Sequence, residues 1–267
     1  MRDESNFESK NHSSGNELQN LNYSTLIPCP SALKILLWDI DGTLMRSNQQ
    51  GAYKEYFATT MQKVYGSCGR LNEMQVSGMT DTQIMYEALR DEDFTTEKIL
   101  ADKQNLLEIF KAEMTAAIGK SKNPYQILDG VCEILAETDK NPRFINALLT
   151  GNLSVAAEIK LKTVGLWHYF ENSPNAFGEI SHDRSDLARE AGKLFNEFYN
   201  FNFKPEQFIV IGDTPNDIAC ARAFGAKVVA VATGRNVSSK ELSASKPDVL
   251  LNDLADSKNV LEIFSNL

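Results

Sequence analysis

The stretch LLWDIDGTL at residues 36–44 decides the fold, because a run of apolar residues ends there in two carboxylates, Asp39 and Asp41. The run has the length and composition of a strand that is buried on both faces. Carboxylates at the end of such a strand cost free energy unless they are paired, hydrogen-bonded or bound to a cation. Because a structural core gains nothing from them, the pair indicates chemistry, with one possible nucleophile and one possible proton carrier.

Further apolar runs follow along the chain, and each ends in polar residues. They cover residues 144–149, 208–211, 228–232 and 249–251. Helical patterns lie between and after them, at residues 154–164, 187–198, 217–224 and 238–244. This alternation predicts an α/β fold with a Rossmann-like open parallel sheet. Because ligands bind at the carboxyl ends of such strands, we expect Asp39, Thr150 and Asp213 to converge on one crevice.

About 100 residues separate the first two predicted strands, which is too many for one crossover. Helical patterns at 51–64, 81–89 and 96–118 predict an inserted all-α subdomain over residues 47–125. A further helical pattern at 131–138 is assigned to the sheet layer, so the α/β core comprises residues 31–46 and 126–267. Residues 1–30 are rich in Ser, Asn and acidic groups and are predicted to be a disordered tail.

The composition excludes several classes of protein. The chain has 267 residues and a formal net charge of -9, and no basic stripe suggests a nucleic-acid partner. No apolar run approaches the ~18 residues that span a bilayer, so no membrane association is expected. The N-terminus lacks the pattern of a signal peptide, and the four cysteines lack CxxC spacing, which favours a reducing, cytoplasmic location without a zinc site. The four cysteines are Cys29, Cys68, Cys132 and Cys220.

Three segments together resemble motifs I, II and IV of the haloacid dehalogenase (HAD) superfamily. They read DIDGTL at residues 39–44, TGN at 150–152 and GDTPND at 212–217, and each follows a predicted strand. The resemblance extends over residues 34 to about 255. It implies a HAD-type core in which the helical insertion is a type-1 cap, as in phosphoglycolate phosphatase-like members.

The resemblance implies roles for the carboxylates. Asp39 would be the nucleophile that attacks phosphorus and forms an aspartyl-phosphate. Asp41 would protonate the leaving group and later deprotonate the attacking water. Asp39, the backbone carbonyl of Asp41, and Asp213 would hold Mg²⁺, which prefers oxygen ligands. Asp217, one turn into the next helix, would reach the metal or its bound waters as an outer ligand.

The resemblance also implies a phosphate site at the end of the second core strand. Thr150, Gly151 and Asn152 would hydrogen-bond the phosphoryl oxygens at a helix N-terminus, which favours anions. Asn152 can equally be a helix N-cap. In the cap, residues 77–81 resemble the turn that faces the substrate in capped phosphatases, although Thr80 or Asp81 can equally be a helix N-cap.

One feature departs from the family pattern. The superfamily places a Lys or Arg before the helix that follows the third strand, and Ser181 occupies the usual Lys position. Arg184 is the nearest cation and the candidate that would neutralise Asp39 and the phosphoryl charge. Lys193, inside the following helix, is the second candidate. Arg184 as a plain solvated residue at a helix start is the remaining interpretation.

Asp41 bears on the choice of reaction. Release of halide needs no proton, whereas cleavage of a phosphate ester needs a general acid, so Asp41 favours phosphoryl transfer. The expected function is Mg²⁺-dependent hydrolysis of a small phosphorylated metabolite, by a monomer or homodimer. The alternatives are a phosphomutase of the same superfamily and a non-catalytic binding or regulatory module that kept the fold.

Overall fold

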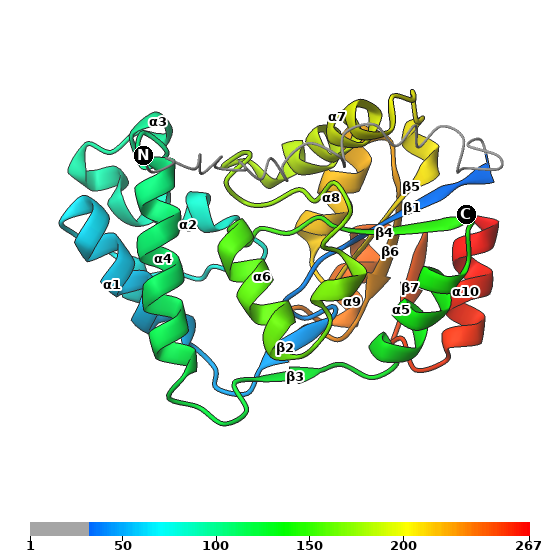
Figure 1. Ribbon diagram of the computed structural model, residues 1–267, viewed down its shortest axis with the longest axis horizontal. Coiled ribbons are helices and arrows are strands. Elements are labelled where there is room, and N and C mark those ends of the chain that lie inside the picture. The colour runs from blue at the N-terminus through cyan, green and yellow to red at the C-terminus, as the bar shows by residue number, and fades with distance from the viewer. Residues whose placement is uncertain (1–31) are drawn as a thin grey trace, which may run out of the picture.

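The computed structural model describes residues 32–267, so the predicted tail at 1–30 lies outside the described residues. Its centre is a five-stranded parallel sheet in the order β4-β1-β5-β6-β7 (Figure 1). The strands are β1 (Lys34–Trp38), β4 (Phe144–Leu148), β5 (Phe208–Gly212), β6 (Lys227–Val231) and β7 (Val249–Leu251). This is the predicted α/β architecture, and the strand limits differ by at most one residue from those read in the sequence.

Helices cover both faces of the sheet, because successive side chains of a strand point to opposite faces. Leu36 and Trp38 of β1 belong to one apolar cluster, and Ile35 and Leu37 belong to the other. The first cluster includes side chains of α5 (Val131–Lys140), α6 (Ser154–Thr163) and α10 (Ser257–Asn266). The second includes side chains of α7 (Leu187–Tyr199), α8 (Pro215–Phe224) and α9 (Ser239–Ala244). The runs therefore read as near-continuous apolar stretches because both faces are buried. Helix α10 is an addition to the elements read from the sequence.

The remaining helices lie together beside the sheet, at the left in Figure 1. They are α1 (Tyr53–Tyr65), α2 (Asp81–Leu89), α3 (Thr96–Ile99) and α4 (Lys103–Ile118). They have an apolar core of their own. In this core the rings of Phe57 and Phe110 pack edge to face, with their centroids 5.1 Å apart. The single helix expected over 96–118 is divided, because α3 ends at Ile99 and the side chain of Asp102 caps α4.

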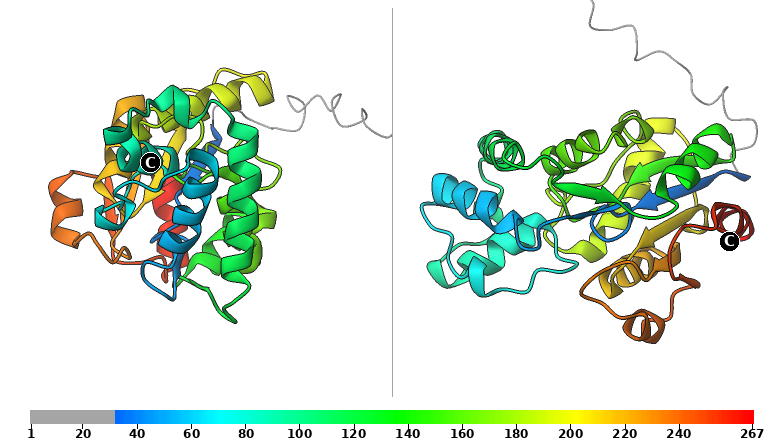
Figure 2. Two further views of the ribbon diagram at one scale, coloured as in Figure 1. Left: turned by 90° about the vertical axis from the view of Figure 1, so that its left-hand side faces the viewer. Right: turned by 90° about the horizontal axis from the view of Figure 1, so that it is seen from below.

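Two chain passages connect the helical part to the sheet, and Figure 2 shows the two parts from further sides. In these passages β2 (Met45–Ser47) pairs antiparallel with β3 (Tyr125–Ile127), so that Ser47 lies opposite Tyr125. This ribbon was not predicted from the sequence. The limits of the subdomain at 47 and 125 stay a prediction. Helix α6 of the core is in contact with both parts, since Leu153 before it and Ala156 within it pack into the core of the helical part.

Short 3₁₀ turns complete the described chain. They are η4 (Leu71–Glu73), η5 (Arg90–Glu92), η6 (Trp167–Tyr169), η7 (Arg184–Asp186) and η8 (Pro205–Gln207). Within residues 32–267, no helix combines the length and the apolar character needed to cross a membrane. The three cysteines of this part of the chain, Cys68, Cys132 and Cys220, are free thiols.

Candidate active site

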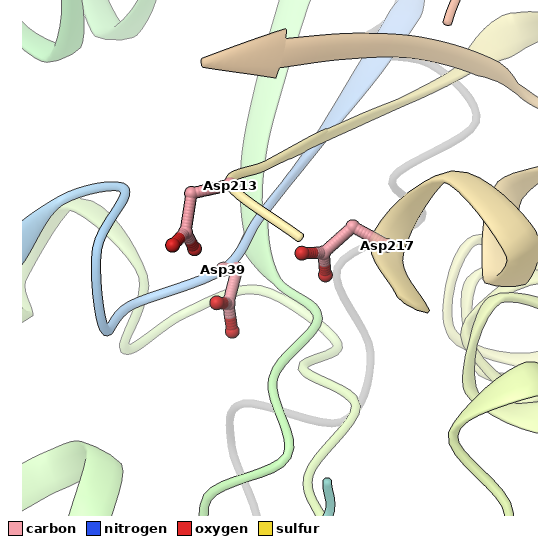
Figure 3. A group of neighbouring side chains, drawn as sticks. All are labelled: Asp39, Asp213 and Asp217. Carbon is pink, nitrogen blue, oxygen red and sulfur yellow. The ribbon is translucent and has the colours of Figure 1, made fainter. Parts of the chain in front are cut away.

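Two neighbouring strands bring the predicted carboxylates together. β1 and β5 pair in parallel with Trp38 opposite Ile211, and the backbone N–H of Asp39 donates to the carbonyl of Ile211 at 2.9 Å. Asp213 follows the end of β5. As a result, one carboxylate oxygen each of Asp39, Asp213 and Asp217 lies within 4.8 Å of the other two (Figure 3). All three side chains are buried.

Asp217 is held by the start of helix α8. Its Oδ2 accepts from the backbone N–H of Thr214 at 3.0 Å, and its own backbone N–H donates to the Thr214 hydroxyl at 3.4 Å, which together form a capping box. The Thr214 hydroxyl also donates to Asp217 Oδ2 at 2.7 Å. Asp217 Oδ1 accepts from Arg184. Asp213 has a weaker polar contact, from the Thr43 hydroxyl at 3.3 Å. Because Asp217 already has protein partners on both oxygens, Asp39 and Asp213 are the carboxylates best placed to bind a cation directly.

Arg184, the first candidate for the cation, lies in the cluster. Its Nη2 is 3.1 Å from Asp39 Oδ1 and also contacts Asp217, and its side chain is only 6% exposed. Its Nε is buried without a hydrogen-bond acceptor among residues 32–267. Lys193, the second candidate, is 60% exposed and pairs with Glu190 at 2.7 Å on the surface of α7. The geometry therefore favours Arg184 and separates Lys193 from the site.

The cluster carries more negative than positive charge. Burial raises the pKa of Asp39 to about 6, although Arg184 opposes the shift, and burial together with the charge of Asp39 raises the pKa of Asp213 well above its usual range. One guanidinium faces three buried carboxylates. A hard divalent cation would supply the missing positive charge, and the set of carboxylate oxygens is the donor chemistry that Mg²⁺ prefers. The residues therefore fit the expected metal.

Asp41 lies beside this cluster but its carboxylate is not part of it. Asp41 Oδ2 accepts from the Asn152 amide at 2.8 Å and from the Lys160 ammonium at 2.5 Å. Lys160 also donates to Asn152 Oδ1 at 2.6 Å. The expectation that the Asp41 carbonyl, rather than its carboxylate, faces the metal stays a prediction.

Lys160 is a polar residue of the site that sequence reasoning missed. It lies on α6, and its side chain is 8% exposed. Burial is the largest effect and opposes the charge of Lys160, but Asp41 together with Tyr56, Tyr125 and Asp81 outweighs burial and raises its pKa. The only signal in the sequence was its place in the helix that directly follows residues 150–152.

The predicted phosphate-binding residues occupy different depths. Gly151 and Asn152 line the cavity described below, whereas Thr150 is fully buried and its hydroxyl accepts from the Asn152 amide at 2.8 Å. A side chain at Gly151 would collide with the cap, since its Cβ would lie 2.4 Å from the carbonyl oxygen of Met79. Glycine is thus required where the cap loop passes over this turn.

The cap loop at 77–81 docks on the core through buried hydrogen bonds. The backbone N–H of Asp81 donates to Gly151 O at 2.7 Å, and Asp81 Oδ2 accepts from the backbone N–H of Leu153 at 2.7 Å. The N-cap interpretation is confirmed for Thr80, which caps α2. Gly78, Met79 and Asp81 line the cavity, and that this loop faces the substrate stays a prediction. Burial raises the pKa of Asp81 to about 7, against the opposing charge of Lys160.

A cavity of about 460 Å³ lies between the core and the helical part. Asp39, Asp41, Arg184 and Asp213 line it from the core. Aromatic and aliphatic side chains of the helical part line its other side, namely Tyr53, Tyr56, Phe57, Ile84 and Phe110. The polar groups of the site therefore face a space large enough for a small metabolite.

Comparisons with known proteins agree with this architecture. A family model described as HAD-hydrolase-like matches residues 187–257. The phosphoglycolate phosphatase of Pasteurella multocida (strain Pm70) is 25% identical over 231 residues, which are 86% of this chain and 98% of that protein.

Solved structures share the fold. The predicted phosphoglycolate phosphatase from Haemophilus somnus 129Pt superposes with a TM-score of 0.56 at 22% identity, over 87% of this chain and 98% of that one. The putative beta-phosphoglucomutase from Bacteroides vulgatus gives a TM-score of 0.57 at 19% identity, over 92% and 94%. The matched segment makes the chain similar to haloacid dehalogenase-like hydrolases, the sequence relative makes it similar to a phosphoglycolate phosphatase, and the solved structures show that it shares their fold.

Proposed function

We propose that this protein is a Mg²⁺-dependent phosphatase that hydrolyses a small phosphorylated metabolite through an aspartyl-phosphate on Asp39. The observation that carries the proposal is the pairing of Arg184 with Asp39 at 3.1 Å, beside Asp213 and at the wall of the cavity. Arg184 keeps a buried carboxylate in its ionised, nucleophilic form. Its Nε, which has no acceptor among residues 32–267, would donate to a phosphoryl oxygen.

The reaction has two displacements at phosphorus. In the first, a carboxylate oxygen of Asp39 bonds to phosphorus while the bond to the leaving oxygen breaks, and Asp41 gives that oxygen a proton. In the second, Asp41 takes a proton from water, whose oxygen bonds to phosphorus and releases Asp39 and inorganic phosphate. Arg184 and the turn at Gly151 and Asn152 bind the phosphoryl oxygens as their charge grows.

The proposed metal site comprises Asp39, the backbone carbonyl of Asp41, and Asp213, with Asp217 as an outer ligand. Bound there, Mg²⁺ would neutralise the carboxylates and stabilise negative charge on the phosphoryl oxygens. The helical part would keep bulk water from the aspartyl-phosphate, and its position over the cavity favours a small substrate over a macromolecule. The proposed protein acts in the cytoplasm as a monomer or homodimer. Nucleic acids and membranes are not among its proposed partners.

Release of phosphate from p-nitrophenyl phosphate in the presence of Mg²⁺ tests the proposal. We expect turnover by the wild-type protein and a loss of about 10³-fold or more in Asp39→Asn, because the amide cannot act as the nucleophile. After acid quenching, wild-type protein incubated with labelled substrate should carry label that hydroxylamine removes, and Asp39→Asn should carry none. Turnover that is undiminished in Asp39→Asn would refute the proposed nucleophile.

The two alternatives give different outcomes in the same assays. A phosphomutase converts a sugar phosphate into its isomer and releases little phosphate, so analysis of both products distinguishes it. A binding module that kept the fold shows neither turnover nor labelling with any member of a panel of metabolite phosphoesters. The presence of Asp39, Asp41 and Asp213 at one edge of the sheet supports an enzyme over this last alternative.

A further inference from the structure

Arg184 lies at the end of a loop that has no regular structure of its own. Residues 178–183 form turns, bends and irregular backbone, and the 3₁₀ turn η7 begins only at Arg184. The side-chain hydroxyl of Thr82, in the first turn of α2, donates to the carbonyl of Gly178 at 2.6 Å. Thr82 and Gly178 are both buried, so this bond satisfies a buried backbone carbonyl. The helical part therefore holds the start of the loop that carries Arg184.

A second hydroxyl of the helical part holds the other end of this loop. The hydroxyl of Thr80 donates to the carbonyl of His182 at 3.1 Å, and it lies 3.2 Å from the hydroxyl of Thr82. The ring of Tyr86, four positions further along α2 than Thr82, meets the ring of His182 edge to face, with their centroids 6.4 Å apart. These contacts place α2 against the loop as far as two residues before Arg184.

The same loop packs tightly against the predicted phosphate-binding turn. A Cβ at Gly178 would lie 2.0 Å from the carbonyl oxygen of Gly151, and the N–H of Gly178 donates to the carbonyl of Asn152 at 2.7 Å. A Cβ at Gly151 would in turn lie 3.0 Å from Nη1 of Arg184. Because guanidinium pairs with carboxylates through donors in a fixed planar fork, a small displacement of the loop would change how Arg184 meets Asp39.

We propose that Thr82 is a positioning residue for Arg184. By holding the carbonyl of Gly178, its hydroxyl fixes the loop, and the loop sets where the guanidinium meets Asp39. Arg184 belongs to the core, but this contact makes its position depend on the docked helical part. Thr80 supports the same loop but also caps α2, so Thr82 is the residue whose effect can be isolated. The kinetic part of this inference rests on the proposed phosphatase function, whereas the contact itself can be tested by unfolding alone.

Thr82→Val and Thr82→Ser test the hydroxyl. Valine has the shape of threonine but cannot donate, so it leaves the buried carbonyl of Gly178 without this partner. With p-nitrophenyl phosphate and Mg²⁺, we expect Thr82→Val to lower kcat by about tenfold with little change in KM, because Arg184 acts on charge that grows in the transition state. Thr82→Ser keeps the donor and should stay within about threefold of the wild-type kcat. Thr115→Val, which loses an exposed hydroxyl bonded within α4, is the control and should leave kcat unchanged.

A double-mutant cycle with Arg184→Lys distinguishes positioning from general damage. Lysine keeps the charge, but its ammonium is a point charge on a flexible stem and depends less on where the loop lies. Thr82→Val should therefore cost about tenfold in kcat in the wild-type background and about twofold or less in Arg184→Lys. The same cycle in urea unfolding needs no turnover, and the two losses in the free energy of unfolding should not add.

The two readouts separate this inference from the proposed activity. Losses that add strictly in unfolding, or a Thr82→Ser variant as impaired as Thr82→Val, would overturn the positioning role. Equal fold losses of kcat in both backgrounds would also overturn it and leave the phosphatase standing. Losses that do not add in unfolding, in a protein that releases no phosphate from any ester, would instead support the positioning of Arg184 and refute the phosphatase.

Discussion

The ammonium nitrogen of Lys160 lies 2.5 Å from a carboxylate oxygen of Asp41, the proposed general acid and base. The same nitrogen is 2.6 Å from Asn152 Oδ1, and the Asn152 amide in turn donates to Asp41. Lys160 is buried, whereas the side chain of Asp41 is 46% exposed and lines the cavity. The buried ammonium of Lys160 therefore holds the more exposed carboxylate of Asp41 in place. Lys160 positions Asp41 but does not itself take part in the proposed proton transfers.

Lys160→Met should impair the steps that need Asp41. The variant removes the ion pair, and a displaced Asp41 protonates the leaving group poorly, so kcat/KM for an alkyl phosphate should fall by about tenfold or more. The loss should be smaller with p-nitrophenyl phosphate, because p-nitrophenolate leaves without needing a proton. Measuring both esters distinguishes a positioning role from general damage. Lys162→Met, an exposed lysine paired with Glu158 on the same helix, is the control. An equal loss with both esters would contradict the positioning role.

Arg184 should matter for stability as well as for activity. Removing the charge in Arg184→Gln leaves Asp39 and Asp217 buried without their cation, and breaking a buried pair in this way costs about 3–5 kcal/mol. Urea unfolding measures this cost. Arg189→Gln, a neighbouring exposed arginine paired with Asp186, should change the free energy of unfolding by less than about 1 kcal/mol.

A double-mutant cycle checks that the cost arises from the contact with Asp217. Adding Asp217→Asn to Arg184→Gln should recover part of the lost stability, because no unpaired charge then remains at that end. Strictly additive losses would contradict a direct interaction between these two residues.

The sequence predicted the parts of the site that depend on local pattern. Asp39 and Asp213 follow apolar runs, and runs buried on both faces are easily read as parallel strands. That two such strands are neighbours, which brings the carboxylates together, followed from the resemblance and from the rule for ligands at strand ends. Arg184 was also found locally, as the nearest cation before a helix.

The rest depends on contacts between distant segments. Lys160 acquires its partner only because α6 packs beside the loop after β1, 119 positions away, and a lysine in a helix is ordinarily a surface residue. The β2–β3 ribbon has three residues in each strand, too few for a periodic signal. Helix α10 was likewise not read from the sequence.

Asp81 predicts how stability varies with pH. Its pKa is raised by burial to about 7 in the folded chain, above the unfolded value of 3.8, so the folded state binds more protons between these values. The contribution of this residue to stability should therefore be fully present below its unfolded pKa, and should fall as the pH rises to 7 with a limiting slope of about 1.4 kcal/mol per pH unit. Asp39 and Asp213 contribute with the same sign.

Asp81→Asn isolates the contribution of this residue. Asparagine keeps an oxygen that can accept from the Leu153 N–H but has no charge to bury. In urea unfolding without Mg²⁺, the difference in stability between pH 5 and pH 7 should be smaller in the variant than in the wild-type protein. The same dependence on pH in both proteins would show that Asp81 does not titrate on folding in this interval.

Mg²⁺ should stabilise the folded protein through Asp39 and Asp213. A ligand that binds the native state alone adds about 2.7 kcal/mol at a concentration 100 times its Kd, so Tm should rise with the concentration of Mg²⁺ and return to its starting value with EDTA.

Asp213→Asn should abolish most of this rise, because it removes one of the two carboxylates with few protein partners. Asp213→Asn should also raise Tm in the absence of metal, since the asparagine ends the repulsion from Asp39 that, together with burial, raises the pKa of Asp213. Asp253→Asn, an exposed carboxylate outside the cavity, should leave the response to Mg²⁺ unchanged. A rise in Tm that Asp213→Asn leaves intact would place the metal elsewhere and contradict the proposed site.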